Sequence, residues 1–249
     1  MDIAIAGGTG IIGSHVVRVA QQRGHAVRVL SRRGGVDVRA GVGLENALRG
    51  VDAVIDVLNI TTTDAKKATE FFMRTTANLL AGQRRDGTGH HLALSIVGVD
   101  RAPYDYYAGK LAQEAAVASG EVPWTILRAT QFHDFAGQIH SRSGFGPLHP
   151  AVRMRTQPID AGEVATRLVE LAEHPAHGRA RDIAGPREEE LADMMRAWAA
   201  HHGRRGWMPR IGLPGAFGRA MRSGVLLPQD DADLRGVTFA EWLSAQPER

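Results

Sequence analysis

Short apolar runs alternate with longer segments of helical periodicity along the first half of the chain. Residues that favour strands occupy 2–6, 26–31, 53–58, 92–97 and 124–128. Between these runs, the apolar spacing predicts helices over 15–23, 44–49, 65–84 and 106–119. Strands and helices that alternate in this way are typical of a parallel sheet covered on both faces. We therefore expect an α/β fold with a doubly wound parallel sheet.

The regularity fades after residue 131, where Gly and Pro crowd residues 144–150 and 212–218. Helices are still predicted over 160–173, 188–200 and 238–245, with a late strand over 181–184. Segment 213–228 is mildly amphipathic, and its pattern fits a cavity lining, a subunit contact or ordinary core. We expect a core over 1–130 and a smaller C-terminal lobe over 131–249 that caps it and returns the late strand to the sheet.

The composition of the 249 residues is that of a globular protein, with 43% hydrophobic and 23% charged residues. The absence of cysteine excludes disulfides, thiolate nucleophiles and Cys-ligated metal sites. The histidines show no metal-ligand spacing, so no metal is expected. No apolar run approaches the roughly 18 residues of a membrane span, and the first residues lack a signal-peptide layout. We expect a cytoplasmic protein without a membrane partner.

The charge balance does not favour nucleic acid as a partner. The formal net charge is only +3. The basic stretch HHGRRGWMPR at 201–210 is interpreted as a solvated connection with Trp207 packed inward. A small-molecule substrate and either a monomer or a homodimer are expected; the sequence does not decide between these two states.

A glycine series lies between the first strand and the first helix. The sequence GGTGIIG places Gly7, Gly10 and Gly13 in a G-x-x-G-x-x-G pattern. In this context one glycine takes a positive φ, a second lets the backbone approach a pyrophosphate, and a third lets the helix pack closely, while free N–H groups at the helix start bind the anion. The core is therefore predicted to be a Rossmann-like NAD(P)-binding domain.

The end of the second strand indicates which dinucleotide binds. An NAD site usually places a carboxylate there for the ribose 2′-hydroxyl. Here the residues are Ser31, Arg32 and Arg33. A hydroxyl and guanidinium groups suit a 2′-phosphate, which predicts a preference for NADPH over NADH.

A candidate proton donor lies on the helix predicted to start near residue 106. Tyr106 has Lys110 four residues on, so both share one helix face, and an ammonium beside a phenol lowers the phenol pKa. Ser95 ends the strand LALSIV, at the sheet edge where ligands bind, and its hydroxyl could hold a substrate carbonyl. Tyr107 is the alternative to Tyr106 as the tyrosine that faces the site.

These motifs together resemble the short-chain dehydrogenase/reductase superfamily, specifically its atypical, NmrA-like NAD(P)-binding group. The resemblance rests on GGTGIIG at 7–13, SRR at 31–33, GVDAVIDVLN at 50–59, LSIVGVD at 94–100, YYAGK at 106–110 and WTILRATQF at 124–132. PIDAGEVATRLVEL at 158–171 and DIAGP at 182–186 extend it over nearly the whole chain.

The resemblance implies roles for individual positions. Ser95, Tyr106 and Lys110 match the catalytic positions, and Lys110 also binds the nicotinamide ribose. The implied cofactor-binding residues are Gly7, Thr9, Gly10, Ile11, Ile12 and Gly13 at the pyrophosphate, Ser31, Arg32 and Arg33 at the adenosine ribose, Val57, Leu58 and Asn59 at the adenine and ribose, and Thr130 and Gln131 beside the nicotinamide.

Two functions from different classes are consistent with this sequence. The first is an NADPH-dependent oxidoreductase that reduces a small carbonyl or quinone-like substrate, with Tyr106 as the proton donor. The second is an NADP(H)-binding redox sensor without efficient turnover, because many NmrA-like relatives lack a working tyrosine. A nucleotide-sugar epimerase is a third reading, but it needs a larger C-terminal lobe.

Overall fold

The structure is a computed structural model that describes residues 1–247. The chain divides into two compact units. Unit 1 consists of Met1–Val99, Pro103–Arg128 and Ala161–Arg181, and unit 2 consists of the remaining described residues. The break after residue 128 lies near the expected boundary at 130, whereas residues 161–181 belong to unit 1 although the sequence places them in the C-terminal lobe.

Unit 1 is built on parallel strands. In spatial order they are β5 (Trp124–Ala129), β4 (His90–Ile96), β3 (Ala53–Asp56), β1 (Asp2–Ala6) and β2 (Ala26–Leu30). Ile5 on β1 aligns with Val29 on β2 and Ile55 on β3, and both isoleucines are completely buried. Because helices cover both faces of this sheet, the central strands are mostly apolar and buried.

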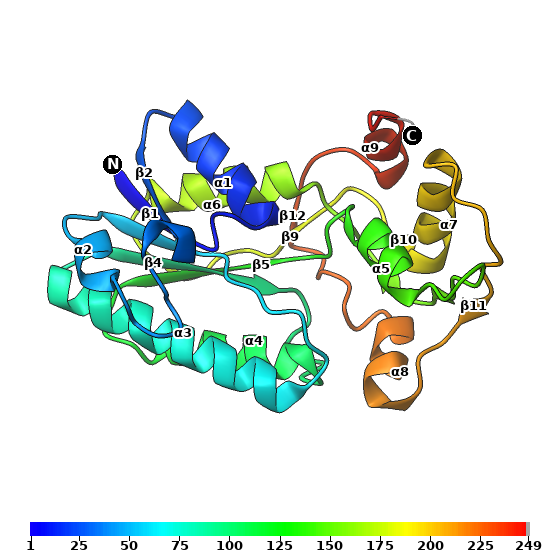
Figure 1. The fold of residues 1–249 in the computed structure, drawn as a ribbon, viewed down its shortest axis with the longest axis horizontal. Coiled ribbons are helices and arrows are strands. Elements are labelled where there is room, and N and C mark those ends of the chain that lie inside the picture. The colour runs from blue at the N-terminus through cyan, green and yellow to red at the C-terminus, as the bar shows by residue number, and fades with distance from the viewer. Residues whose placement is uncertain (248–249) are drawn as a thin grey trace. The chain divides into compact units, whose positions relative to one another are not determined.

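Helices lie on both faces of this sheet, as Figure 1 shows. On one face α1 (Ile11–Gln22) packs against α6 (Ala161–Ala172), and on the other α3 (Ala65–Asp86) packs along α4 (Tyr106–Ala118). The short helix α2 (Leu44–Leu48) contacts α3. The predicted doubly wound α/β fold is confirmed.

Further short strands follow β5 in the sheet order. β8 (Gly178–Arg179) pairs with β5, and the full order is β12-β9-β5-β4-β3-β1-β2. β9 (Ile183–Ala184) reaches β5 through Ala129 and pairs in parallel with β12 (Asp233–Leu234). The late strand expected over 181–184 is therefore present as β9.

Unit 2 consists of short helices and two-residue strands. Its helix α7 (Leu191–His201) contacts both α5 (Phe135–Ser143) and α9 (Phe239–Ser244). A fourth helix, α8 (Gly215–Ser223), lies within the amphipathic segment 213–228. The strand pairs are β10 (Glu189–Glu190) with β7 (Arg155–Thr156), and β11 (Arg210–Ile211) with β6 (Ala151–Val152).

The position of Trp207 on the surface of unit 2 differs from the one expected from the sequence. Trp207 is 71% exposed, so the interpretation that it packs inward is wrong. Its backbone pairs with Pro147 and His149, and these bonds hold it in a surface segment.

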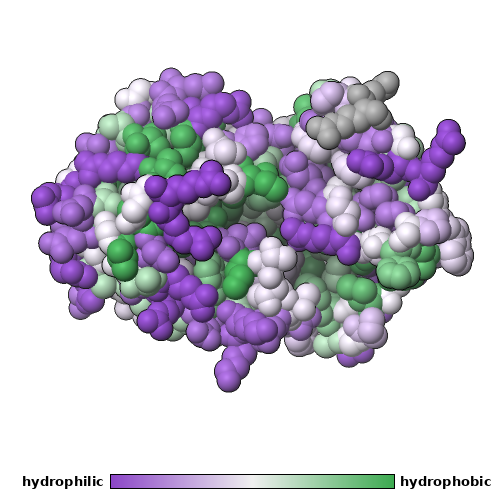
Figure 2. All heavy atoms as spheres, in the orientation of Figure 1, coloured by the Kyte–Doolittle hydropathy of each residue, from purple (hydrophilic) through white to green (hydrophobic). Residues whose placement is uncertain are grey.

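Hydrophilic side chains predominate on the face of unit 1 drawn in Figure 2. Among residues 1–247, no helix combines the length and hydrophobicity that a membrane span requires.

Candidate functional site

The glycine loop after β1 has the tight geometry that a phosphate-binding turn needs. Gly7 has φ +88°, and the Gly10 amide donates to the Gly7 carbonyl at 2.9 Å. A Cβ on Gly13 would lie 2.1 Å from that same carbonyl oxygen. Glycine is therefore required at Gly13 because the first turn of α1 lies against the loop.

The start of α1 provides donors for an anion. The helix begins at Ile11 without a side-chain cap and without an acidic residue in its first turn. The first N–H groups of a helix have no intrahelical acceptor, and the helix dipole favours negative charge there. Thr9, Gly10 and Ile11 are exposed beside these donors. This part of the chain fits a dinucleotide pyrophosphate.

The loop lies directly against the end of β3. A Cβ on Gly7 would approach the Val57 carbonyl oxygen at 2.8 Å and the Leu58 nitrogen at 3.0 Å. Val57 is buried, Leu58 half-buried and Asn59 exposed. The structure thus brings together two predicted cofactor segments, 7–13 and 57–59, that are far apart in the sequence.

The end of β2 presents two exposed guanidinium groups. Ser31 caps the short 3-10 helix η1 (Arg32–Gly34) by accepting from the Gly34 amide. Arg32 and Arg33 are exposed, and neither forms an ion pair with any residue in 1–247. Both side chains are therefore available to a ligand that carries negative charge.

Tyr106 is the first residue of α4, and its hydroxyl donates to Asn59 Oδ1 at 2.8 Å. The preceding residue, Asp105, has φ 51° and ψ −125°, and it is the one non-glycine residue with positive φ among residues 1–247. Because Asn59 follows the segment that touches Gly7, the hydroxyl of Tyr106 lies on the phosphate-loop side of α4. Tyr107 is buried.

The predicted effect of Lys110 on Tyr106 is not found. Burial raises the Tyr106 pKa above its ordinary value, and the charges of Tyr107 and Asp56 add to the rise. The Lys110 ammonium donates instead to the Leu94 carbonyl oxygen and to Gln113 Oε1. Although i and i+4 share a helix face, the two side chains take partners from different parts of the chain.

Ser95 is 3% exposed and lies near a buried ionic cluster. Arg128 donates two hydrogen bonds to Glu114, each 2.8 Å long, and Arg179 donates a third at 2.9 Å. Burial alone would raise the Glu114 pKa, but the hydrogen bond from Arg128 and the charges of Arg128 and Arg179 lower it. The Ser95 hydroxyl is buried and has no hydrogen-bond partner among residues 1–247.

Thr130 and Gln131 lie in unit 2, where both side chains have partners. Thr130 donates from its hydroxyl to the Gln157 carbonyl, and Gln131 Oε1 accepts from Thr156, each at 2.6 Å. These bonds fix the segment after β5 within its own unit.

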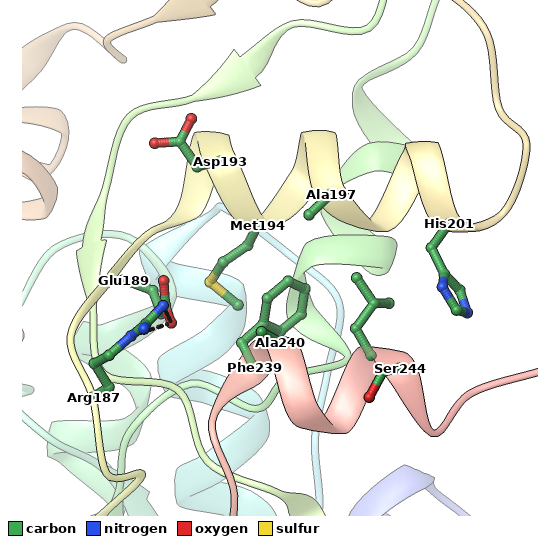
Figure 3. A pocket seen from close by; sticks show the side chains of 10 residues that line it. Arg187, Glu189, Asp193, Met194, Ala197, His201, Phe239, Ala240 and Ser244 are labelled. Carbon is green, nitrogen blue, oxygen red and sulfur yellow. Dashed lines mark hydrogen bonds and ion pairs between the residues drawn. The ribbon is translucent and has the colours of Figure 1, made fainter.

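A cavity of about 340 Å³ lies between α7 and α9 in unit 2. Figure 3 shows apolar side chains from both helices facing it, among them Met194 and Phe239. Its polar rim includes the Arg187–Glu189 ion pair. The sequence did not single out these residues.

Two further residues of unit 1 were also missed. Asp56, completely buried at the end of β3, accepts from the Leu58 amide and from Gln113 Nε2. The available signal was a carboxylate inside the apolar run AVIDVL. Gln113 gave no signal, because a glutamine on a helix is ordinarily a surface residue.

Comparison with known proteins agrees with this geometry. The NAD(P)H-binding family matches residues 7–175. No curated protein sequence matches the chain.

Solved structures share the fold at low sequence identity. A short-chain dehydrogenase/reductase superfamily protein from Agrobacterium tumefaciens with bound NAD has a TM-score of 0.69 and 17% identity, covering 98% of this chain and 95% of that one. An NADPH-dependent quinone oxidoreductase from Escherichia coli has a TM-score of 0.69 and 15% identity, covering 97% and 98%. UDP-glucose 4-epimerase from Thermus thermophilus in complex with NAD has a TM-score of 0.67 and 17% identity, covering 98% and 92%.

The family match covers the glycine loop, the end of β2, the end of β3 and α4, which are the segments that carry the site described above. The chain belongs to the NAD(P)H-binding family and has the atypical short-chain dehydrogenase/reductase fold.

Proposed function

We propose that the protein is an NADPH-dependent oxidoreductase that reduces a small carbonyl or quinone-like substrate. The observation that carries the proposal is the Tyr106 hydroxyl, held by Asn59 on the segment that touches the phosphate loop. The Escherichia coli protein that shares the fold is an NADPH-dependent quinone oxidoreductase, and its chemistry is consistent with this proposal.

In the proposed reduction, each residue of the site has a separate role. The bound dinucleotide supplies a hydride to the substrate carbon. Tyr106 donates its proton to the substrate oxygen, so that a C–H and an O–H bond form while the C=O π bond breaks, and solvent then reprotonates the phenolate. Lys110 would hold the nicotinamide ribose. Ser95 is left out of the proton step because this residue is only 3% exposed.

The direction of the Tyr106 pKa shift favours reduction over the reverse reaction. Burial raises this pKa, so the phenol stays protonated at neutral pH. A proton donor must be protonated at the start of the reaction, whereas alcohol oxidation needs the phenolate as a base. We therefore expect carbonyl or quinone reduction to be the faster direction.

NADPH is the proposed cofactor because Arg32 and Arg33 are exposed without ion pairs in residues 1–247. A guanidinium–phosphate hydrogen bond contributes about 1.5–3 kcal/mol. Arg32→Ala should therefore weaken NADPH binding about 10-fold or more and leave NADH binding unchanged. Arg74→Ala, which removes an exposed arginine from α3, is the matched control. Equal losses for both dinucleotides in Arg32→Ala would contradict a 2′-phosphate contact.

The central test is NADPH oxidation with a panel of aldehydes, ketones and quinones, after NADPH and NADH titrations. Tyr106→Phe should lower turnover about 100-fold or more, because positioned proton donors contribute that much, while NADPH affinity stays the same. Tyr104→Phe, at an exposed tyrosine near the start of α4, is the control and should have wild-type turnover. Wild-type turnover in Tyr106→Phe would overturn the proton-donor role.

A redox sensor is the second candidate function. It is favoured by the bonds that Lys110 makes within the protein, to the Leu94 carbonyl and to Gln113. Tight NADPH binding without turnover of any panel member would support the sensor over the reductase.

A further inference from the structure

A buried polar chain links the end of β3 to Lys110. Asp56 is completely buried, and its Oδ2 accepts from Gln113 Nε2 at 2.9 Å. Gln113 is 1% exposed, and its Oε1 accepts from the Lys110 ammonium. The proton-transfer step proposed above uses neither Asp56 nor Gln113.

The hydrogen bonds fix the direction of this chain. A carboxylate only accepts, so Gln113 must direct its amide NH₂ toward Asp56 and its carbonyl toward Lys110. The carbonyl oxygen then requires a donor, which the ammonium provides. A second N–H of the ammonium is bonded to the Leu94 carbonyl oxygen of β4, 2.5 Å away. Asp56 thereby orients Lys110 without touching it.

The groups around Lys110 come from four elements. Asp56 on β3 and Glu114 on α4 are the anions that act on it, β4 contributes the neutral Leu94 carbonyl, and Phe72 on α3 places its ring centroid 4.6 Å from Nζ. Glu114 is bonded directly to Arg128 and Arg179. Of the two anions that act on Lys110, Asp56 is therefore the one that forms no bond to an arginine within residues 1–247.

Burial works against the charge of Lys110. It lowers the Lys110 pKa to about 8, while the charges of Asp56 and Glu114 act in the opposite direction. Burial likewise raises the Asp56 pKa, and the Leu58 amide, the Lys110 charge and Gln113 oppose that rise. Each ionised group supports the charge of the other, as expected for opposite charges in a desolvated site.

We propose that Asp56, acting through Gln113, is a positioning residue that keeps Lys110 protonated and fixed against β4. The part of this proposal that concerns dinucleotide binding rests on the proposed function, in which Lys110 holds the ribose. The protonation of Lys110 does not depend on that function and can be measured separately.

The chain has three lysines, so isotope labelling of lysine side chains isolates Lys110. Lys66 and Lys67 are exposed on α3 and serve as internal references. An NMR titration of the wild-type protein should give a Lys110 midpoint near pH 8. Asp56→Asn should lower this midpoint by about one pH unit or more, because an opposite charge close by shifts a pKa by that amount.

One further variant serves as a control, and another tests the role of Gln113. Asp64→Asn removes the carboxylate beside Lys67, 3.9 Å away, and should leave the Lys110 midpoint unchanged. Gln113→Met keeps Asp56 and removes the relay, and should shift Lys110 in the same direction as Asp56→Asn. If Asp56→Asn does not fold, Gln113→Met supplies the test. A folded variant of either kind with a wild-type Lys110 midpoint would overturn the proposal.

A second readout connects the chain to the dinucleotide. NADPH affinity of the wild type should fall as pH rises through about 8, where Lys110 loses its proton. In Asp56→Asn the same fall should occur at lower pH, with wild-type affinity restored at pH 6. A shifted NMR midpoint with an unshifted affinity profile would leave the Asp56–Lys110 link intact and reject the ribose role of Lys110.

Discussion

Two buried carboxylates of unit 1 have opposite electrostatic environments. Glu114 accepts hydrogen bonds from two arginines, and its pKa is lowered in spite of burial. Asp56 accepts from an amide nitrogen and a glutamine, and burial raises its pKa. Direct contact with a guanidinium thus keeps one carboxylate charged at neutral pH. The other is left sensitive to its surroundings.

The largest expected effect comes from the arginine-bound carboxylate. Glu114→Gln removes the carboxylate that pairs with the buried Arg128, and breaking a buried pair in this way costs about 3–5 kcal/mol of unfolding free energy. Urea denaturation at pH 7 measures the loss. Glu121→Gln, at an exposed residue paired with Arg84, should cost less than about 1 kcal/mol. Equal losses in the two variants would mean that Glu114 is not the structural ion described here.

The pH dependence of stability should separate the two carboxylates by sign. The lowered Glu114 pKa gives stability that is present above the unfolded pKa and lost as pH falls through the folded value. The raised Asp56 pKa gives stability that is present below the unfolded pKa and lost as pH rises through the folded value. From pH 3 to 7, Glu114→Gln should therefore become less stable relative to wild type, and Asp56→Asn more stable.

Apart from this pH dependence, Asp56→Asn should lose about 1 kcal/mol, less than Glu114→Gln, because an asparagine oxygen accepts a weaker hydrogen bond from Gln113 than a carboxylate does. Urea titrations of both variants at several pH values measure the two slopes. Parallel slopes would show that the two carboxylates titrate alike, and the contrast between them would be lost.

The smallest effect concerns the second arginine of Glu114. The Arg179 side chain is 46% exposed, against 8% for Arg128. Solvent screens a half-exposed ion pair, so Arg179→Ala should cost only about 0.2–1 kcal/mol. The same denaturation experiment checks it. A loss as large as that of Glu114→Gln would shift the structural role from Arg128 to Arg179.

Sequence periodicity was sufficient for most of unit 1. Its strands are mostly apolar and its longer helices carry apolar faces, so local patterns report most of the buried positions directly. In unit 2 the strands are two residues long, as in β6 and β7. A strand of two residues is defined by its hydrogen bonds to a partner strand, so the local sequence pattern does not predict it. The helix α5, with Gly137 in its first turn, was not expected because glycine has a low helix propensity.

The parts of the site that depend on backbone conformation could be predicted from the sequence. The hydrogen-bond partners of the side chains could not. The glycine loop could be predicted because its steric requirements are visible as glycines at fixed spacing in the sequence. The hydrogen-bond partners of Tyr106 and Lys110 could not be predicted, because Asn59 and the Leu94 carbonyl belong to other segments of the chain. Spacing of i and i+4 specifies a common helix face, but tertiary contacts determine which atoms meet.

The conformation of Asp105 links the position of the proposed proton donor to the stability of unit 1. A non-glycine residue in such a region stores about 1–3 kcal/mol of strain and keeps it only while its surroundings enforce it. The residue that follows is Tyr106, so the orientation of the phenol depends on the stability reserve of unit 1. Heat or a remote destabilising substitution should therefore misalign the proposed proton donor before the protein unfolds, and loss of the proposed activity should precede loss of structure.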